Sequence, residues 1–353
     1  MTKISHLRKS MSQAYHSRKL SEAAKLGETL IREHRAKNPH SPGLSDDLFN
    51  LALIYDELDQ LEQAAMLYIE SSHHIKTGDL TALAMRSNNL AGVLARIGAL
   101  EPAYLHYQQA QHIYKRHLGS DHPSYADSLY NLANIAAEVF PDIALELHEE
   151  ALEIRKKNGN SKDVLHSLHS MAFIHEEMGD YKKAASYGEA ALNQAYGLDY
   201  VSACSYLAML YESLNQHEKA LEMYNQVIKN ADKSLHGDCL RSMATLNQAI
   251  GQTTMAEEYM LQHIKSQKEA GQLKDICFLI QLYLENDTYD KAVNILVYAL
   301  NNMDTISDQN MDTLMDTLSQ AKDKHQLLDA MRDANNAEKI RSILDDWQKG
   351  NAS

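Results

Sequence analysis

The chain has 353 residues, a formal net charge of −14 and a hydrophobic content of 44%. The acidic balance argues against a nucleic-acid or anionic-membrane partner, because such surfaces require a surplus of Lys and Arg. No segment approaches about 18 apolar residues in a row, so we expect no transmembrane helix. Only 14 Gly and 5 Pro punctuate the chain, a composition that favours helices over sheets.

The first segment, MTKISHLRKSMSQAYHSRKL, is basic but contains no apolar run, so we do not expect a secretory signal. Three cysteines, Cys204, Cys239 and Cys277, lie in separate segments without paired spacing. An odd number of scattered cysteines is typical of a reducing compartment, and we therefore expect a cytoplasmic protein.

A large residue followed by a small one recurs along the chain. The second member of each pair is here called the first anchor, and the steps between first anchors are 39 to 42 residues as far as Ala172 and 36 residues after it. The pairs are Leu51-Ala52, Leu90-Ala91, Leu132-Ala133, Met171-Ala172, Leu207-Ala208, Met243-Ala244 and the looser copy Leu279-Ile280.

A second small residue, the second anchor, follows each pair at a fixed distance. The distance is twelve residues in every copy but the one around Phe140-Pro141, where it is eleven. Small residues at fixed positions let two backbones approach closely, and turn-prone residues such as Gly98 and Gly179 lie between them. Each repeat is therefore predicted to be a helix, a tight turn and a helix. The second anchors are Ala64, Ala103, Ala144, Ala184, Ala220, Ala256 and Ala292.

Two segments, EEMGDYKKAASYGEAAL (176–192) and ESLNQHEKALEMYNQVI (212–228), resemble the tetratricopeptide consensus. A third, YLHYQQAQHIYKRHLGSDHPSYADSLYNLANI (104–135), is similar to the longer repeat of kinesin light chains, including its Leu-Gly-x-Asp-His-Pro linker. The change of repeat length is similar to that of bacterial peptide-pheromone receptors. The resemblance covers about residues 8–303, counting a degenerate first pair around Ala14 and Ala23.

The resemblance implies an all-α fold, a right-handed superhelical solenoid of about eight helix-turn-helix repeats. We predict a degenerate first helical repeat at 1–40, the solenoid at 41–303 and C-terminal capping helices at 304–353. A separate partner-docking tail is the alternative for the last segment. About 40 residues precede the first clear repeat, too few for the amino-terminal effector domain that the pheromone receptors carry.

The repeat register also assigns one face of each first helix to a binding groove. Positions six and two before the first anchor, and one and five after it, cluster opposite the buried side of the helix. In tetratricopeptide proteins this face lines the concave groove where partners bind. The partner-binding candidates on it are Asn50, Asn89, Arg96, Asn131, Asn134, His166, Phe173, Tyr206 and Met209.

Asn50, Asn89 and Asn131 occupy the same position in three successive repeats, although Asn is a poor residue for the middle of a helix. A carboxamide both donates and accepts hydrogen bonds, which suits an extended peptide backbone and equally suits a bond to a neighbouring repeat. Asparagines at this position hold peptide backbones in kinesin light chains and pheromone receptors, so the resemblance implies the binding role.

Phe173, Tyr206 and Met209 place apolar side chains where a solvated face should be polar. We interpret them as anchors for a ligand, with coverage by superhelical curvature or by the closing helices as the alternative.

Catalytic and metal signatures are absent from the sequence. The 18 histidines include no His-Glu-x-x-His pair, and peptide contact or solvation is favoured over metal binding for His166 and His169. There is no phosphate-binding glycine loop and no Gly-x-Ser-x-Gly, and the cysteines are interpreted as core residues. We therefore predict no cofactor, no metal and no enzymatic activity.

The sequence thus predicts a scaffold or adaptor that holds an extended segment of a protein or peptide partner, with the oligomeric state left open. The alternative is a regulatory peptide receptor, whose superhelix changes on ligand binding and controls an effector protein. A third hypothesis, a phosphatase-like enzyme, has no residue constellation behind it.

Overall fold

The computed structural model describes residues 3–37, 42–138, 140–266 and 273–302, together with Thr317 and Ser342. No strand occurs in these ranges, and the predicted all-α fold is confirmed. The capping helices predicted for 304–353 lie outside the described residues, apart from Thr317 and Ser342. The chain divides into two compact units, Met1–Ala195 and Tyr196–Ser353.

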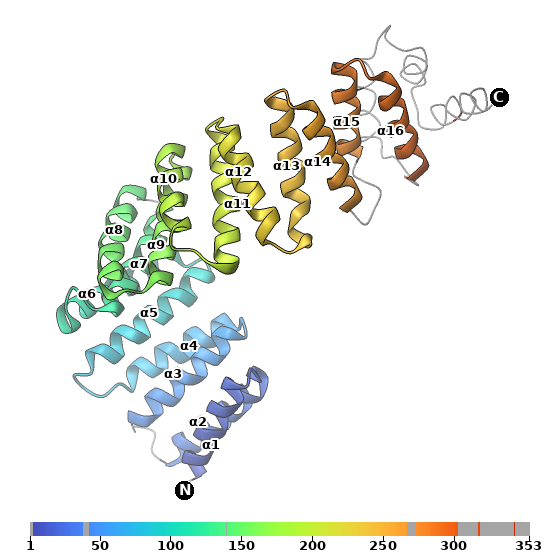
Figure 1. Ribbon diagram of the computed structural model, residues 1–353. Helices are drawn as coiled ribbons and strands as arrows, with labels where there is room; N and C mark the ends of the chain where they lie inside the picture. The colour runs from blue at the N-terminus through green and yellow to red at the C-terminus, as the bar shows by residue number, and fades with distance from the viewer. Residues whose placement is uncertain are drawn as a thin grey trace. The chain divides into compact units, whose positions relative to one another are not determined.

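The described residues of the first unit form a stack of five helical hairpins, each packed against the next in chain order (Figure 1). Its helices are α1 (Lys3–His16), α2 (Leu20–Lys37), α3 (Pro42–Glu57), α4 (Leu61–His73), α5 (Leu80–Arg96), α6 (Leu100–Leu118), α7 (Pro123–Ala136), α8 (Pro141–Asn158), α9 (Ser161–Glu177) and α10 (Tyr181–Leu192).

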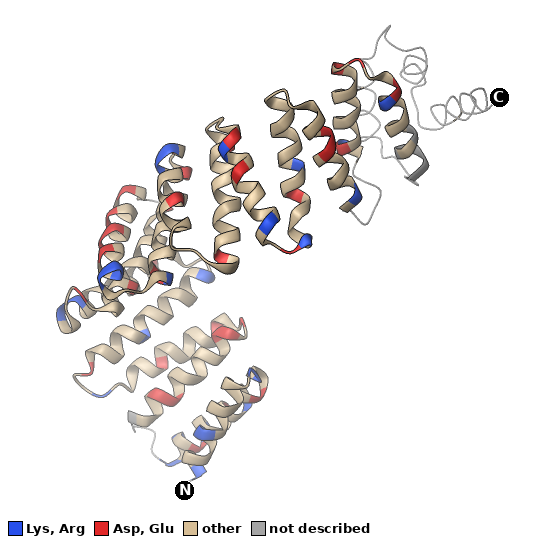
Figure 2. Cartoon of the chain, viewed as in Figure 1, with Lys and Arg blue, Asp and Glu red and all other residues tan. Residues whose placement is uncertain are grey.

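The second unit continues the same architecture through three further hairpins in its described part. Its helices are α11 (Gly197–Ser213), α12 (His217–Asn230), the short 3₁₀ helix η1 (Lys233–Leu235), α13 (His236–Ala249), α14 (Thr253–Ser266), α15 (Leu273–Glu285) and α16 (Tyr289–Asn302). Lys and Arg are interspersed with Asp and Glu along both units (Figure 2).

The predicted anchors are fully buried in the seven hairpins that follow the first. All seven first anchors and all seven second anchors predicted from the sequence are 0% exposed. A buried Ala lets the two helices of a hairpin approach closely, while larger residues such as Tyr68 fill the space toward the next hairpin. The spacing argument is confirmed at each of these sites.

A left-handed residue ends the first helix in seven hairpins, always five residues before the second anchor. Glycine occupies this position at Gly98 (φ 88°) and Gly179 (φ 78°), and Asp59 (φ 60°) and Asn215 (φ 54°) are among the residues that replace it. The following amide donates back to a carbonyl five residues earlier, as from Asp180 to His175 at 2.8 Å. This hydrogen bond is typical of a Schellman helix end, which favours Gly or Asn in the left-handed position.

The same turn corrects the register of the first repeat. Arg18 (φ 59°) is its left-handed residue, and Ala23 follows five residues later as the second anchor. Met11, which is 3% exposed, therefore occupies the first-anchor position, three residues before the predicted Ala14. A bulky first anchor is accommodated next to Gly27, where a Cβ atom would lie 3.1 Å from Met11 Sδ and 2.6 Å from Leu51 Cδ1.

Buried polar side chains join successive hairpins, a feature that the repeat spacing does not predict. The residue five positions before the first anchor is buried in each repeat after the first, and it is charged at Asp47, Arg86 and Asp275. Asp47 accepts two hydrogen bonds from Arg8, at 2.6 and 2.8 Å, and contacts His34 Nδ1 at 2.9 Å. Asp275 pairs in the same way with an arginine and a histidine of the hairpin before it.

Arg86 is the largest of these buried groups and is 1% exposed. Its guanidinium donates to Ser71 at 2.8 Å, to Ser45 at 3.1 Å and to Asp46 at 2.8 Å, and it lies 5.0 Å from the centre of the Phe49 ring. Because α5 contributes the arginine and α3 and α4 contribute its partners, this cluster fixes the second hairpin against the third.

We expect Arg86→Ala to lower the free energy of unfolding by about 2–4 kcal/mol, because it removes several buried hydrogen bonds and leaves a cavity. Arg96→Ala is the matched control on the same helix. Its ion pairs with Asp56 and Asp59 are partly exposed, so it should cost no more than about 1 kcal/mol. Urea denaturation followed by far-ultraviolet circular dichroism measures both, and equal losses would contradict the assignment.

Candidate functional site

A pocket of 640 Å³ opens at the carboxyl ends of α7 and α9, within the first unit. Its lining comes from these two helices, from the turn after each, and from the first residue of α8. The lining residues that matter below are Asn134, Glu138, Ser170, Phe173, Glu177 and Met178. A volume of this size is within the range of small-ligand sites.

The repeat register explains why these side chains meet. Asn134 and Glu138 stand one and five residues after the first anchor Ala133, and Phe173 and Glu177 stand one and five residues after Ala172. We name the face that carries these positions, on α3, α5, α7 and α9, the first-helix surface. The pocket therefore lies on the surface predicted to bind a partner, and it brings together Asn134 and Phe173 from the predicted site.

Phe173 is the most exposed apolar side chain of the pocket, with 56% of its surface accessible. Met178 beside it is 47% exposed, while Ile174 lies buried beneath. Leaving a phenyl ring in water forgoes the burial free energy of about 1.5–3 kcal/mol that a core position would gain. The neighbouring anchor Ala172 packs the helix so that position 173 must point outward, and the exposure of Phe173 is thus imposed by the fold.

Charges on the first-helix surface fall into two groups. Asp46, Glu57 and Asp127 are each held by an arginine: Asp46 by Arg86 at 2.8 Å, Glu57 by Arg18 at 2.7 Å and Asp127 by Arg155 at 2.9 Å. Glu138 and Glu177, which line the pocket, have no ion pair or hydrogen bond with any other described side chain. The two carboxylates beside Phe173 are therefore uncompensated, unlike the others of the same face.

The three aligned asparagines differ in their contacts. Asn131 donates to Asn88 Oδ1 at 3.0 Å, which joins α7 to α5. Asn89 donates to the Met85 carbonyl of its own helix at 2.8 Å. Asn50 is exposed and has no hydrogen bond to another described residue. Only the amide of Asn131 thus bonds to a neighbouring repeat. All three amides keep a donor or an acceptor group that could bond to a ligand.

The remaining predicted residues are scattered. Arg96 forms ion pairs with Asp56 and with Asp59, which join α5 to the preceding hairpin. His166 is exposed two turns before Phe173 on α9. Tyr206 is half-buried and Met209 is 55% exposed on α11, and both belong to the second unit.

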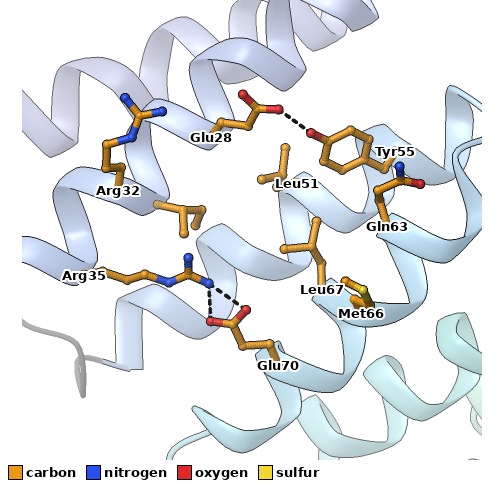
Figure 3. A pocket seen from close by; sticks show the side chains of 10 residues that line it. Glu28, Arg32, Arg35, Leu51, Tyr55, Gln63, Met66, Leu67 and Glu70 are labelled. Atoms are coloured by element: carbon orange, nitrogen blue, oxygen red, sulfur yellow. Dashed lines mark hydrogen bonds and ion pairs between the residues drawn. The ribbon is translucent and has the colours of Figure 1, made fainter.

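A second pocket, of 510 Å³, lies between α2, α3 and α4 and was not predicted (Figure 3). Two pairs of its polar groups are engaged with each other. Arg35 holds Glu70 at 2.5 and 2.7 Å, and Tyr55 donates to Glu28 at 2.5 Å. Burial and this hydrogen bond raise the pKa of Tyr55 to about 12. No sequence signal marks this pocket, because its lining comes from three helices of two different hairpins.

A buried histidine lies near the α7–α9 pocket. His148 is 0% exposed, its ring meets that of Tyr130 edge-on at 5.2 Å, and the Tyr130 hydroxyl accepts a hydrogen bond from Ser170 of the pocket. Neither ring nitrogen has a hydrogen-bond partner among the described residues. Burial, with a smaller contribution from Arg155, lowers the pKa of His148 to about 4.

The three cysteines lie in the core of the second unit. Cys204, Cys239 and Cys277 are buried, and burial raises the pKa of each thiol, which agrees with their interpretation as core residues. Within the described ranges, no three His, Cys, Asp or Glu side chains gather into a metal-binding group. None of the described helices has the length and apolar content needed to span a bilayer.

The tetratricopeptide repeat family model matches residues 81–157, 140–197 and 163–233, which confirms the resemblance for this part of the chain. Among solved structures, BtubC (BKLC) from P. vanneervenii is 18% identical with a TM-score of 0.51, and the match covers 65% of this chain and 91% of that one. The C-terminal part of a repeat protein from Cytophaga hutchinsonii is 14% identical with a TM-score of 0.50, covering 87% and 98%.

A putative kinesin light chain with nearly identical TPR-like repeats, from Podosopora anserina, is 22% identical with a TM-score of 0.48, covering 55% of this chain and 98% of that one. At these identities, BtubC and the Cytophaga protein share the fold with this chain and no more. A comparison with curated protein sequences finds no match.

His148 should make stability depend on pH in a defined window. Its folded pKa of about 4 lies below the ordinary value of 6.5, so between these values the unfolded chain binds the extra proton. The stability due to neutral His148 is fully present above pH 6.5 and falls by about 1.4 kcal/mol per pH unit below it. In His148→Leu, which copies Leu296 at the equivalent position, that dependence should be lost. Denaturation at pH 8 and pH 5 measures the change in the free energy of unfolding between these two values. A change as large in His148→Leu as in the wild type would contradict the assignment.

Proposed function

We propose that the chain is a protein-interaction scaffold that holds an extended segment of a partner on its first-helix surface. The match of residues 81–233 to the tetratricopeptide repeat family supports this proposal. The observation that carries this proposal is the pocket at α7 and α9, with Phe173 exposed in it. An apolar ring that the fold keeps in water gains its burial free energy only when a partner covers it. No catalytic step is assigned to the chain.

The aligned amides favour an extended segment over a folded domain. Asn50, Asn89 and Asn131 recur once per repeat on α3, α5 and α7, so they present a polar group at regular intervals along the first-helix surface. A peptide backbone offers alternating donors and acceptors, and a side-chain amide supplies both kinds of partner. The row leads along the surface to the α7–α9 pocket, where an apolar side chain of the segment would contact Phe173.

We expect Phe173→Ala to weaken binding about tenfold or more, because a central aromatic anchor is typical of the residues that dominate binding energy. The probe is a short peptide selected from a phage-displayed random library on the full chain, and fluorescence anisotropy measures its affinity. Leu105→Ala is the matched control, since Leu105 is 57% exposed on α6 and lines neither pocket described above. Equal binding by Phe173→Ala and the wild type, for every selected peptide, would refute the proposal.

The asparagines separate binding from structural support. Asn50→Ala should lower the affinity for the same peptide without changing the thermal midpoint, because Asn50 bonds to no other described residue. Asn131→Ala should lower both, since it also breaks the 3.0 Å bond to Asn88. Anisotropy and thermal denaturation give the two readouts. If Asn131→Ala lost stability but both variants kept the affinity of the wild type, the aligned asparagines would have a structural role only.

A further inference from the structure

We propose that the segment bound at the α7–α9 pocket carries an apolar side chain with Lys or Arg beside it. This inference rests on the proposed function and specifies the chemistry of the partner. The apolar side chain would cover Phe173, and the cation would neutralise Glu138 and Glu177. The inference depends on the difference between these two carboxylates and the other acidic groups of the same surface.

The fold neutralises its own acidic groups elsewhere on the first-helix surface. Asp46, Glu57 and Asp127 each bind an arginine of this chain at 2.7 to 2.9 Å, and the one cation among the candidate residues there, Arg96, is itself engaged by two aspartates. Glu138 and Glu177 have no such partner among the described residues. No described Lys or Arg of this chain therefore pairs with the carboxylates of the pocket, and a cation of the ligand would supply the missing countercharge.

The pocket lining selects the sign of the ligand charge. Its described lining contains two glutamates, an asparagine, a serine and a histidine, but no Lys or Arg. An acidic segment would therefore bring like charges together without a countercharge, whereas a basic one would meet two carboxylates. The exposed ring of Phe173 adds to this preference, because the face of an aromatic ring attracts a cation as well as an apolar group.

The pocket between α2, α3 and α4 shows what a compensated site looks like in the same unit. There, Glu70 is held by Arg35 and Glu28 accepts from Tyr55, so both carboxylates are already satisfied (Figure 3). A ligand cation would have to compete with these bonds. The two pockets are similar in volume, and the availability of their carboxylates distinguishes them.

The spacing of the groups limits the motif to a short stretch of chain. Phe173 and both carboxylates line one pocket of 640 Å³, so a single side chain and its near neighbours must reach them all. An extended chain rises about 3.3 Å per residue, which places the cation within about three residues of the apolar side chain. The net charge of −14 would add a long-range attraction for such a segment.

The test is a selection of short random peptides by phage display on the full chain, repeated on the double variant Glu138→Gln/Glu177→Gln. We expect peptides selected on the wild type to be enriched in Lys and Arg near an apolar residue and poor in Asp and Glu. The enrichment should disappear on the double variant. Glu146→Gln is the control, because Glu146 is an exposed residue of α8 that does not line the pocket, and it should keep the enrichment.

Affinities of one selected peptide complete the experiment. The double variant should bind it about fivefold more weakly at low ionic strength, as expected for two partly exposed ion pairs, and the gap should shrink in high salt. Glu146→Gln should bind as the wild type does. Neutral or acidic peptides that still depend on Phe173 would overturn this inference and leave the proposed function standing. If the affinity of the selected peptides depended neither on Phe173 nor on the two glutamates, both this inference and the proposed function would be overturned.

Discussion

The close contact between small residues inside each hairpin is the constraint on which the other features depend. Ala52 and Ala64, and their counterparts in each later repeat, are inaccessible to solvent, so the two helices of a hairpin have no rotational freedom about their axes. Once the anchor side of α9 is fixed inward, position 173 lies outward whatever residue occupies it. The position of the first-helix surface is therefore a consequence of this packing.

The electrostatic organisation of the first unit follows a similar division. Arginines such as Arg86 and Arg155 are drawn into the stack, where they satisfy serines and carbonyls and extend one hydrogen bond to an acidic group at the surface. An overall acidic chain thus carries few uncompensated carboxylates on its first-helix surface. Those that remain acquire more influence on a ligand than the net charge alone would suggest, because short-range contacts outweigh screened long-range ones.

The fold could be predicted from the sequence because its signals are local. An anchor such as Ala172 and a turn residue such as Gly179 lie on one hairpin, so their spacing alone reveals the helix-turn-helix unit. The face of Phe173 follows from the same register. Contacts between hairpins could not be predicted, since the partners of Arg86 lie up to 41 residues away and nothing in the local pattern identifies them. The first anchor at Met11 was misplaced for a related reason: Gly27, on the other helix of that hairpin, makes the room for it.

The position five residues before the first anchor has one further consequence. It holds Asp47, Arg86, Ser128 and Ser167 in successive repeats, all of them buried, and Asp47, Arg86 and Ser167 each bond to the preceding hairpin. If the hairpin of Asp47 or of Arg86 were moved to another place in the stack, its buried charge would face a helix that offers no counterpart, at a cost of several kcal/mol. Although the repeats share one backbone design, they are not interchangeable, because a buried charge such as that of Arg86 needs the partners that the preceding hairpin supplies. Shuffling or duplicating hairpins would therefore require each buried charge to be moved together with the helices that carry its partners.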